Sequence, residues 1–181
     1  MQKKGFTLIE LLVVIGILAI LTAAVVVVLN PAELLRQSRD AQRMSDMDAL
    51  RGSINLFLST VSSPTFASSG QFVTNTAGAN FSGGIFTAGA LTVNTSTLVT
   101  GTGWVPINFG LMSSTVGSAP LSALPIDPIN DGNYAYAGAF NSPNLQYELD
   151  TRLESTKYAS KMTPTANASL LLYQVGNNLS M

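Results

Sequence analysis

The residues from Phe6 to Leu29 form an apolar run that contains a single charged side chain, Glu10. A helix of this length, at about 1.5 Å per residue, extends roughly 36 Å, whereas the hydrocarbon core of a bilayer is about 30 Å thick. The run is therefore long enough to cross a membrane. Lys3 and Lys4 precede it, and no basic residue follows until Arg36. This distribution predicts a cytoplasmic N-terminus, with the rest of the chain on the other side of the membrane.

A secretory signal peptide also begins with basic residues and an apolar stretch. Its apolar region is only about 7 to 15 residues long and is followed by small residues at a cleavage site. The run in this chain is longer, and its small pair, Ala23 and Ala24, is followed by the apolar segment Val25–Leu29. Cleavage after the alanines would leave a hydrophobic N-terminus, so a membrane span is favoured.

Glu10 is the anomaly of this span. An acidic side chain inside an apolar helix costs a few kcal/mol or more unless it finds a partner. Two interpretations stay open on these grounds. Glu10 lies about one turn into the run, so its carboxylate can reach back to the membrane interface. Alternatively, it pairs with a positive group that becomes available only when the precursor is cut.

The sequence from Lys3 to Ile15, KKGFTLIELLVVI, resembles the class III signal of type IV pilins and type II secretion pseudopilins. The resemblance implies cleavage after Gly5 by a prepilin peptidase and N-methylation of the new amine on Phe6. It also implies that Glu10 neutralises the N-terminal amine of a neighbouring subunit in a filament. Glycine suits a cleavage position physically, because a residue without a Cβ lets the backbone lie close to a protease.

The same resemblance implies a filament subunit that is stored in the cytoplasmic membrane and then assembled into an extracellular, homo-oligomeric helical filament. The implied partners are the prepilin peptidase, an assembly ATPase and an inner-membrane platform protein. A surface pilus and a secretion pseudopilus share the motif, so both stay open, as do adhesion, motility and DNA uptake. A membrane-anchored binding domain that never polymerises is an alternative of another class.

Residues 30–61 are predicted to continue the helix as an amphipathic rod. Pro31 lacks an N–H donor and crowds the preceding turn, which predicts a kink or an unwound stretch at Val27–Asn30. The charged residues between Glu33 and Arg51 are predicted to form a mostly solvated face, with Arg36 and Asp40 paired on it. The apolar face recurs at spacings of three and four and comprises Met44, Met47, Leu50, Ile54, Phe57, Leu58 and Val61.

Residues 62–181 are predicted to form a loop-rich β head. The fold class is α+β, with a small antiparallel sheet packed on the apolar stripe of the helix. Residues 1–5 are the leader, 6–29 the hydrophobic helix and 30–61 its amphipathic continuation. The predicted strands are Gln71–Thr74, Ile85–Thr87, Ala90–Val93, Leu98–Thr100, Tyr134–Ala137, Leu145–Leu149 and Leu170–Val175, with Trp104–Asn108 extended.

The second half of this region resembles the heads of pilins and pseudopilins that lack cysteine. The resemblance rests on the segments Gly103–Ile107, Leu124–Pro128 and Tyr147–Leu149, the last followed by Leu153–Ser155. The missing C-terminal cysteine pair departs from pilins that have a disulfide-bounded loop. Residues 52–126 contain no Asp, Glu, Lys or Arg and are rich in Ser, Thr, Gly, Ala and Asn.

Composition argues against enzymatic and nucleic-acid-binding roles. The chain has no His and no Cys, which removes thiol chemistry and the commonest general base. Its net charge is -1, with 10% charged residues, so no basic footprint for nucleic acid is present. No nucleophile–base arrangement is recognisable. We therefore expect a structural protein without a catalytic site, an obligatory cofactor or a specific nucleic-acid partner.

One cluster of oxygen-bearing side chains has the chemistry of a calcium site. Asp127, Asn130, Asp131 and Asn133 lie within a few residues of one another. Calcium prefers carboxylate and amide oxygens of this kind. The spacing differs from that of an EF-hand, and Asx-rich segments with glycine more often form plain turns. Calcium is thus the alternative to a purely structural turn.

Overall fold

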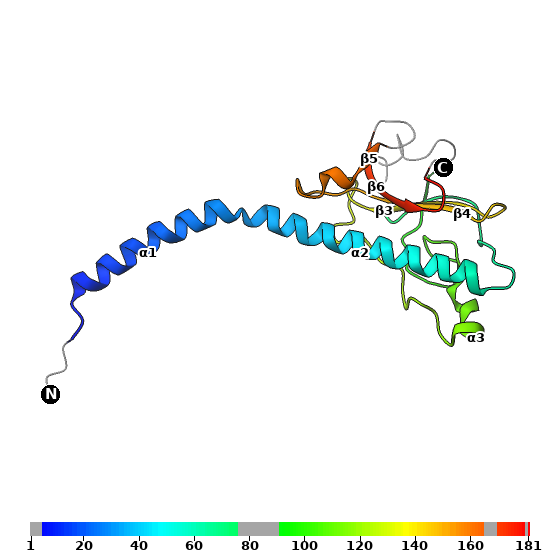
Figure 1. Cartoon of the computed structure of the whole chain (residues 1–181), viewed down its shortest axis with the longest axis horizontal. Helices are drawn as coiled ribbons and strands as arrows, with labels where there is room; N and C mark the ends of the chain where they lie inside the picture. Colours follow the sequence, from blue (N-terminus) through cyan, green and yellow to red (C-terminus); the bar gives the residue numbers. More distant parts are fainter. Residues whose placement is uncertain (1–4, 76–90, 165–169, 180) are drawn as a thin grey trace. The chain divides into compact units, whose positions relative to one another are not determined.

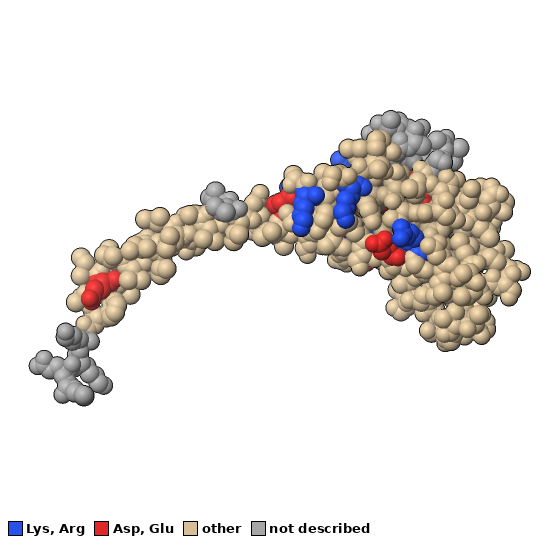
Figure 2. Space-filling model, in the orientation of Figure 1, with Lys and Arg blue, Asp and Glu red and all other residues tan. Residues whose placement is uncertain are grey.

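The first helix, α1, spans Leu8–Leu29 in the computed structural model, which describes residues 5–75, 91–164, 170–179 and 181 (Figure 1). Among these residues one helical stretch, Leu8–Val26, is long and apolar enough to cross a membrane, with a mean hydropathy of 2.8. Its apolar side chains are exposed in the single chain. In the space-filling view, one acidic side chain interrupts the uncharged surface of this segment (Figure 2). The sequence identifies it as Glu10.

A single residue separates α1 from α2, which spans Pro31–Thr60. Asn30 adopts the left-handed conformation, with φ 39°, and its side-chain oxygen accepts a hydrogen bond from the N–H of Glu33. Proline is well tolerated at the first position of a helix, where its missing donor would have no partner. The predicted disruption is confirmed at Asn30, whereas residues 27–29 remain helical.

The chain divides into two compact units, residues 1–36 and 37–181. Within the second unit, the apolar stripe of α2 is buried as predicted at Met47, Leu50, Ile54 and Phe57, while Met44, Leu58 and Val61 are half-buried.

The predicted pair of Arg36 and Asp40 is wrong. Arg36 lies 3.8 Å from Glu33, whereas Asp40 pairs with Arg43 at 2.9 Å, and the side chains of Asp40 and Arg43 are completely buried. The physical reason is the spacing. Asp40 and Arg43 extend the same series of three- and four-residue steps that continues through Met47, so they lie on the core-facing side of the helix.

The head contains a six-stranded sheet in the order β2-β1-β3-β4-β6-β5 among the described residues. Neighbouring strands are antiparallel, except that β1 and β2 run parallel. The α+β fold class is thereby confirmed. The strands are β1 (Gly70–Val73), β2 (Leu91–Val93), β3 (Tyr136–Asn141), β4 (Gln146–Thr151), β5 (Thr163–Pro164) and β6 (Leu171–Gly176). Three short helical turns accompany them, η2 (Phe109–Met112), α3 (Ser113–Val116) and η3 (Ala159–Lys161).

Most predicted strands exist with shifted ends, and one differs. The hairpin predicted from Tyr134 to Leu149 is formed by β3 and β4, and the predictions for β1, β2 and β6 are also confirmed. Ile85–Thr87 and Ala90 lie outside the described residues. Leu98–Thr100 is not a strand, and its one contact of this kind with the segment Trp104–Asn108, predicted only as extended, is a bridge between Thr100 and Asn108. Sequence reasoning missed β5.

A tight fold-back of the chain explains why those two segments do not form a ladder. Gly101 has φ 91°, and a Cβ on Gly103 would lie 2.2 Å from the carbonyl oxygen of Leu98. Such a close approach is open only to glycine. The loop therefore packs on itself, and Trp104 turns inward, where its indole N–H donates to the carbonyl of Pro125.

One face of the sheet packs on α2 to form the main core. The contributing side chains come from β3 and β4, from α2 and from the loop that precedes β3. They include Tyr136, Phe140, Tyr147, Leu149, Met47, Leu50, Ile54, Phe57, Trp104, Phe109 and Met112. The opposite face carries a smaller cluster of Val73, Ala135, Ala137 and Leu172. The sheet thus has a helix-covered face and an outer face with its own buried residues.

Candidate processing and assembly segment

The Gly5–Phe6 bond lies in non-helical backbone, ahead of the first turn of α1. Phe6 is 78% exposed, and a Cβ built on Gly5 would meet no atom within 4 Å. Exposed, non-helical chain near a terminus is the kind of segment that proteases cut. Because the chain itself leaves room for a side chain at Gly5, any requirement for glycine here comes from outside the chain.

Glu10 is held by Thr7 at the start of α1. Its Oε2 accepts hydrogen bonds from the backbone N–H of Thr7 at 2.8 Å and from the Thr7 hydroxyl at 2.6 Å. The Thr7 Oγ1 in turn accepts from the N–H of Glu10 at 3.3 Å. This is a capping box, which satisfies two helix-end donors reciprocally. Sequence reasoning missed Thr7, although the Thr-x-x-Glu spacing was visible.

Phe6 and Glu10 share a shallow, largely apolar groove of about 360 Å³ along the start of α1. Ile9, Val13 and Val14 complete its lining. The structure therefore brings the predicted cleavage residue and the predicted assembly residue to one surface. An apolar surface with one carboxylate at its edge is suited to contact with another apolar helix.

The comparison with known families addresses this segment. Residues 1–26 match the model of the prokaryotic N-terminal methylation motif. The chain carries the class III signal of type IV pilins and pseudopilins. No curated protein and no solved structure matches the chain. A class III signal implies processing by prepilin peptidase and assembly into a filament, and it points to a structural subunit. The apolar helix is compatible with membrane anchoring of the precursor.

A second polar constellation lies in the head, where a buried ion-pair network centres on Arg43. Arg43 contacts three carboxylates, those of Asp40, Asp127 and Glu154, and Glu154 also binds Arg39 at 2.6 Å. Burial by itself lowers the pKa of Arg43, but its hydrogen bonds and charge attraction with these acids outweigh burial and raise the pKa above the ordinary value. The network joins α2 to two loops of the head, and sequence reasoning did not find it.

Asp40 completes this network through the loop after β4. Its Oδ2 accepts hydrogen bonds from the N–H of Ser155 at 2.8 Å and from the Ser155 hydroxyl at 2.6 Å. The N–H of Glu154 donates to Oδ1 of the same carboxylate at 2.9 Å. Every charge in the network therefore has partners, which is the condition under which buried ions are tolerated. Its role is to fix the head on the helix.

The residues of the proposed calcium cluster form turns. Asp127 binds Arg43 and also accepts from the N–H of Ile129 at 2.8 Å, while Oδ1 of Asp131 accepts from the N–H groups of Asn133 and Tyr134. Asn130 has φ 49°, and its Oδ1 accepts from Thr74. The described residues contain no group of three or more acidic side chains placed to hold a metal.

Side-chain oxygens of Asp127, Asn130 and Asp131 thus already accept hydrogen bonds from the protein. A calcium ion at Asp127 would have to compete with Arg43 for its carboxylate. Calcium binding stays a prediction from sequence, which a calcium titration of the protein can measure.

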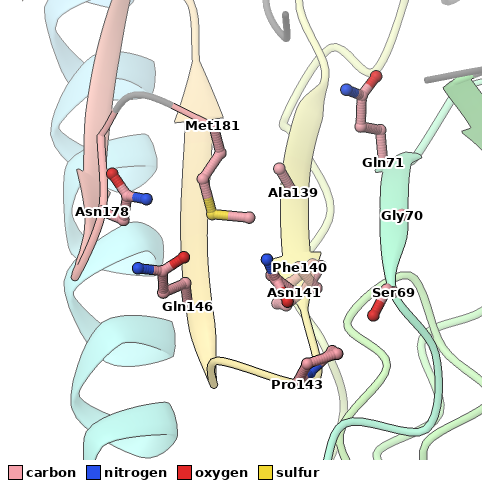
Figure 3. A pocket seen from close by; sticks show the side chains of 10 residues that line it. All are labelled: Ser69, Gly70, Gln71, Ala139, Phe140, Asn141, Pro143, Gln146, Asn178 and Met181. Carbon is pink, nitrogen blue, oxygen red and sulfur yellow. The ribbon is translucent and has the colours of Figure 1, made fainter. Parts of the chain in front are cut away.

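A groove of about 510 Å³ lies on the outer face of the sheet (Figure 3). Gln71, Asn141, Gln146 and Asn178 line it with carboxamide groups, and Met181 forms one wall. In the close-up, these residues come from β1, from β3 and β4 and from the chain after β6, with α2 behind the sheet. Nothing in the sequence pointed to this groove, because it is assembled from distant segments.

Proposed function

We propose that the chain is the structural subunit of a type IV pilus or pilus-like surface filament, and that it polymerises through α1. The observation that carries this proposal is the methylation motif at residues 1–26, combined with an apolar helix whose described large apolar side chains are exposed in the single chain. Exposed apolar side chains of this extent call for a lipid or protein environment. Lipid covers these side chains in the stored precursor, and the same helices of neighbouring subunits cover them in the filament.

Processing prepares the subunit for assembly. Cleavage after Gly5 removes Lys3 and Lys4 and creates an amine on Phe6, next to the groove that Glu10 borders. A neighbouring subunit that presents this amine to Glu10 compensates a carboxylate that is costly inside an apolar bundle. Each correct neighbour contact then buries one ion pair, and a contact in the wrong register leaves two unpaired charges.

The proposal includes the machinery that the class III signal calls for: a prepilin peptidase to cut and methylate, an assembly ATPase and an inner-membrane platform protein. The precursor lies in the cytoplasmic membrane with its N-terminus in the cytoplasm. After assembly the helix lies in the filament interior, and the head faces the medium. The described head residues carry no arrangement that suggests a catalytic role.

The deciding experiment compares surface filaments from strains that produce the native chain, Gly5→Val or Gly52→Ala. A Cβ at either glycine would meet no atom within 4 Å, and Gly52 lies on α2, outside the proposed polymerisation helix, so neither change disturbs the fold of the chain. We expect filaments from the native chain and from Gly52→Ala, with subunits that begin at N-methylated Phe6 by intact mass. Gly5→Val should remain an uncut membrane precursor without filaments.

The alternatives predict other results. A secretion pseudopilin would leave the native strain without long surface filaments, and its deletion would abolish protein secretion. A membrane-anchored binding domain would stay monomeric in the membrane whether or not it was cut. Subunits that begin at Met1, or beyond Ala24, would contradict the proposed processing.

A further inference from the structure

Two buried acids lie on the outer face of the sheet, far along the chain from the segment described above. Glu148 and Asp150 are separated by one residue on β4, so their side chains point to the same face. The residue between them, Leu149, packs in the core on the α2 side. Glu148 is 1% exposed and Asp150 is 0% exposed. Both carboxyl groups are therefore removed from water.

The two acids differ in their hydrogen bonds. Glu148 Oε1 accepts from the side-chain amide of Gln174 on β6 at 2.7 Å, and its Oε2 accepts from the backbone N–H of Met181 at 3.0 Å. Neither oxygen of Asp150 has a hydrogen-bond partner among the described residues. A buried carboxylate without any donor is among the least favourable arrangements in a protein interior.

No positive charge compensates the pair. On β3 the positions opposite Asp150 and Glu148 are Ala137 and Ala139, and on β6 they are Gln174 and Gly176. On β4 the same face also carries Gln146, and Arg152, just beyond the end of β4, is exposed with its guanidinium 5.9 Å from the centre of the Tyr134 ring.

No ion pair joins either acid to Lys or Arg in the described part of the chain, whose pairs are those of Arg36, Arg39 and Arg43. Residues 76–90 and 165–169 contain no charged residue in their sequence.

We propose that Asp150 and Glu148 form a proton-operated latch that closes β6 and Met181 onto β4. At neutral pH a proton taken from solvent keeps Asp150 as a neutral carboxylic acid. Loss of this proton places two like charges on neighbouring positions of one buried strand face, directly beside β6. The hydrogen bonds that Gln174 and Met181 make with Glu148 then weaken, and β6 is held less tightly on β4.

The direction of the pH effect follows from the folded-state titration. Burial raises the pKa of Glu148 to about 7. Burial and the charge of Glu148 outweigh the opposing effect of the nearby Gln174 side chain and raise the pKa of Asp150 well above its ordinary value. The folded head binds these protons more tightly than the unfolded chain does. The stabilisation that this pair contributes to the folded head is therefore fully present below about pH 4 and is lost as the pH rises through neutrality. Over the range in which a group titrates, the unfolding equilibrium constant rises by about tenfold per pH unit for that group.

The test uses the full chain in detergent micelles and the fluorescence of Trp104, which is the only tryptophan and is completely buried in the head core. Thermal unfolding is followed from pH 5 to pH 9. We expect the midpoint of the native chain to fall as pH rises. Asp150→Asn should show a shallower fall, because only Glu148 still titrates, and should exceed the native chain at pH 8, whereas Asp150→Asn combined with Glu148→Gln should keep a nearly constant midpoint. Asp48→Asn, which removes an exposed acid on α2, should retain the native pH dependence.

Two results would overturn the proposal. One is an unchanged pH dependence in Asp150→Asn. The other is a midpoint that calcium or magnesium raises at pH 8 in the native chain but not in Asp150→Asn, because a cation would then occupy the pair in place of the proton. If Asp150→Asn does not fold, infrared difference spectra of the native chain decide. They should show a carboxylic-acid carbonyl band that disappears only above pH 6, and its absence refutes the latch.

Discussion

Arg43 and Asp127 face each other out of contact with solvent, with Nε 2.6 Å from Oδ2 and Nη2 2.9 Å from Oδ1. Two parallel hydrogen bonds of this kind fix both the distance and the orientation of the partners. The guanidinium also lies 5.0 Å from the centre of the Tyr134 ring. One arginine of α2 therefore determines where the loop after Pro125 lies, and that loop leads into β3.

The first prediction concerns this arginine. Arg43→Met keeps an apolar stem but leaves the buried acids Asp40, Asp127 and Glu154 without their shared cation. Breaking a buried ion pair by removing one partner costs about 3 to 5 kcal/mol. We expect a loss of this size in the unfolding free energy, measured by urea denaturation with Trp104 fluorescence. Arg51→Met, on an exposed position of α2, should change it by less than about 0.5 kcal/mol. Equal stability of both variants would contradict the role of the network.

The second prediction concerns acid pH. The hydrogen bond from Arg39, together with the contact with Arg43, lowers the pKa of Glu154 in the folded head. A depressed carboxyl pKa contributes stability that is present above the unfolded value, about 4.5, and is lost as the pH falls through the folded value. We therefore expect the native head to weaken below about pH 4, the reverse of the trend set by Asp150.

Glu154→Gln isolates this effect. The variant should be less stable than the native chain at pH 7 and should lose less stability on acidification, as followed by thermal unfolding at several pH values. Glu33→Gln, in the first unit of the chain, serves as the control and should behave like the native protein. Parallel pH profiles for Glu154→Gln and the native chain would rule out a contribution from Glu154.

The contrast between the two ends of the molecule shows what sequence can predict. The processing segment is local, so Gly5, Phe6 and Glu10 were recognisable from one short motif, and even the overlooked Thr7 cap lies three residues from its partner. The strands β3, β4 and β6 followed from alternation and turn residues, which are also local signals. The fold-back between Leu98 and Asn108 had no comparable pattern, because it depends on the positive φ of Gly101 and on a close approach of Gly103 to the Leu98 carbonyl.

The buried charges required information that a single sequence does not contain. Asp40 and Arg43 continue the apolar stripe of α2 by their spacing, but charge favoured a solvated face in the prediction. Their burial depends on Asp127 and Glu154, which are far along the chain and meet α2 only in the folded head. The same holds for Asp150, whose environment is determined by strand neighbours.

The third prediction concerns independent folding of the head. Residues 37–181 form a compact unit that contains the whole core, including the buried face of α2. Deleting residues up to Leu29 should therefore leave a soluble, folded monomer. Circular dichroism should show mixed helix and sheet, and gel filtration should show a single monomeric species. A purely helical or disordered spectrum would argue against a pilin-type head.

The last prediction concerns Glu10, the single charge of the span. If it pairs with the Phe6 amine of a neighbour, Glu10→Ala removes the partner of that amine and lowers the cost of keeping the monomer in the membrane. Filaments should then fail or become sparse while processed monomer accumulates, as measured by microscopy of sheared filaments and immunoblots of membranes. Glu10→Gln should behave similarly, because an amide cannot neutralise the amine.

Thr7→Val separates this pairing from capping, since it removes the hydroxyl that holds Glu10 but keeps the carboxylate for the neighbour. We expect Thr7→Val to form filaments, with a modest loss of helix-start stability of about 1 kcal/mol. Normal filament yield and register in Glu10→Ala would instead mean that Glu10 only reaches the membrane interface.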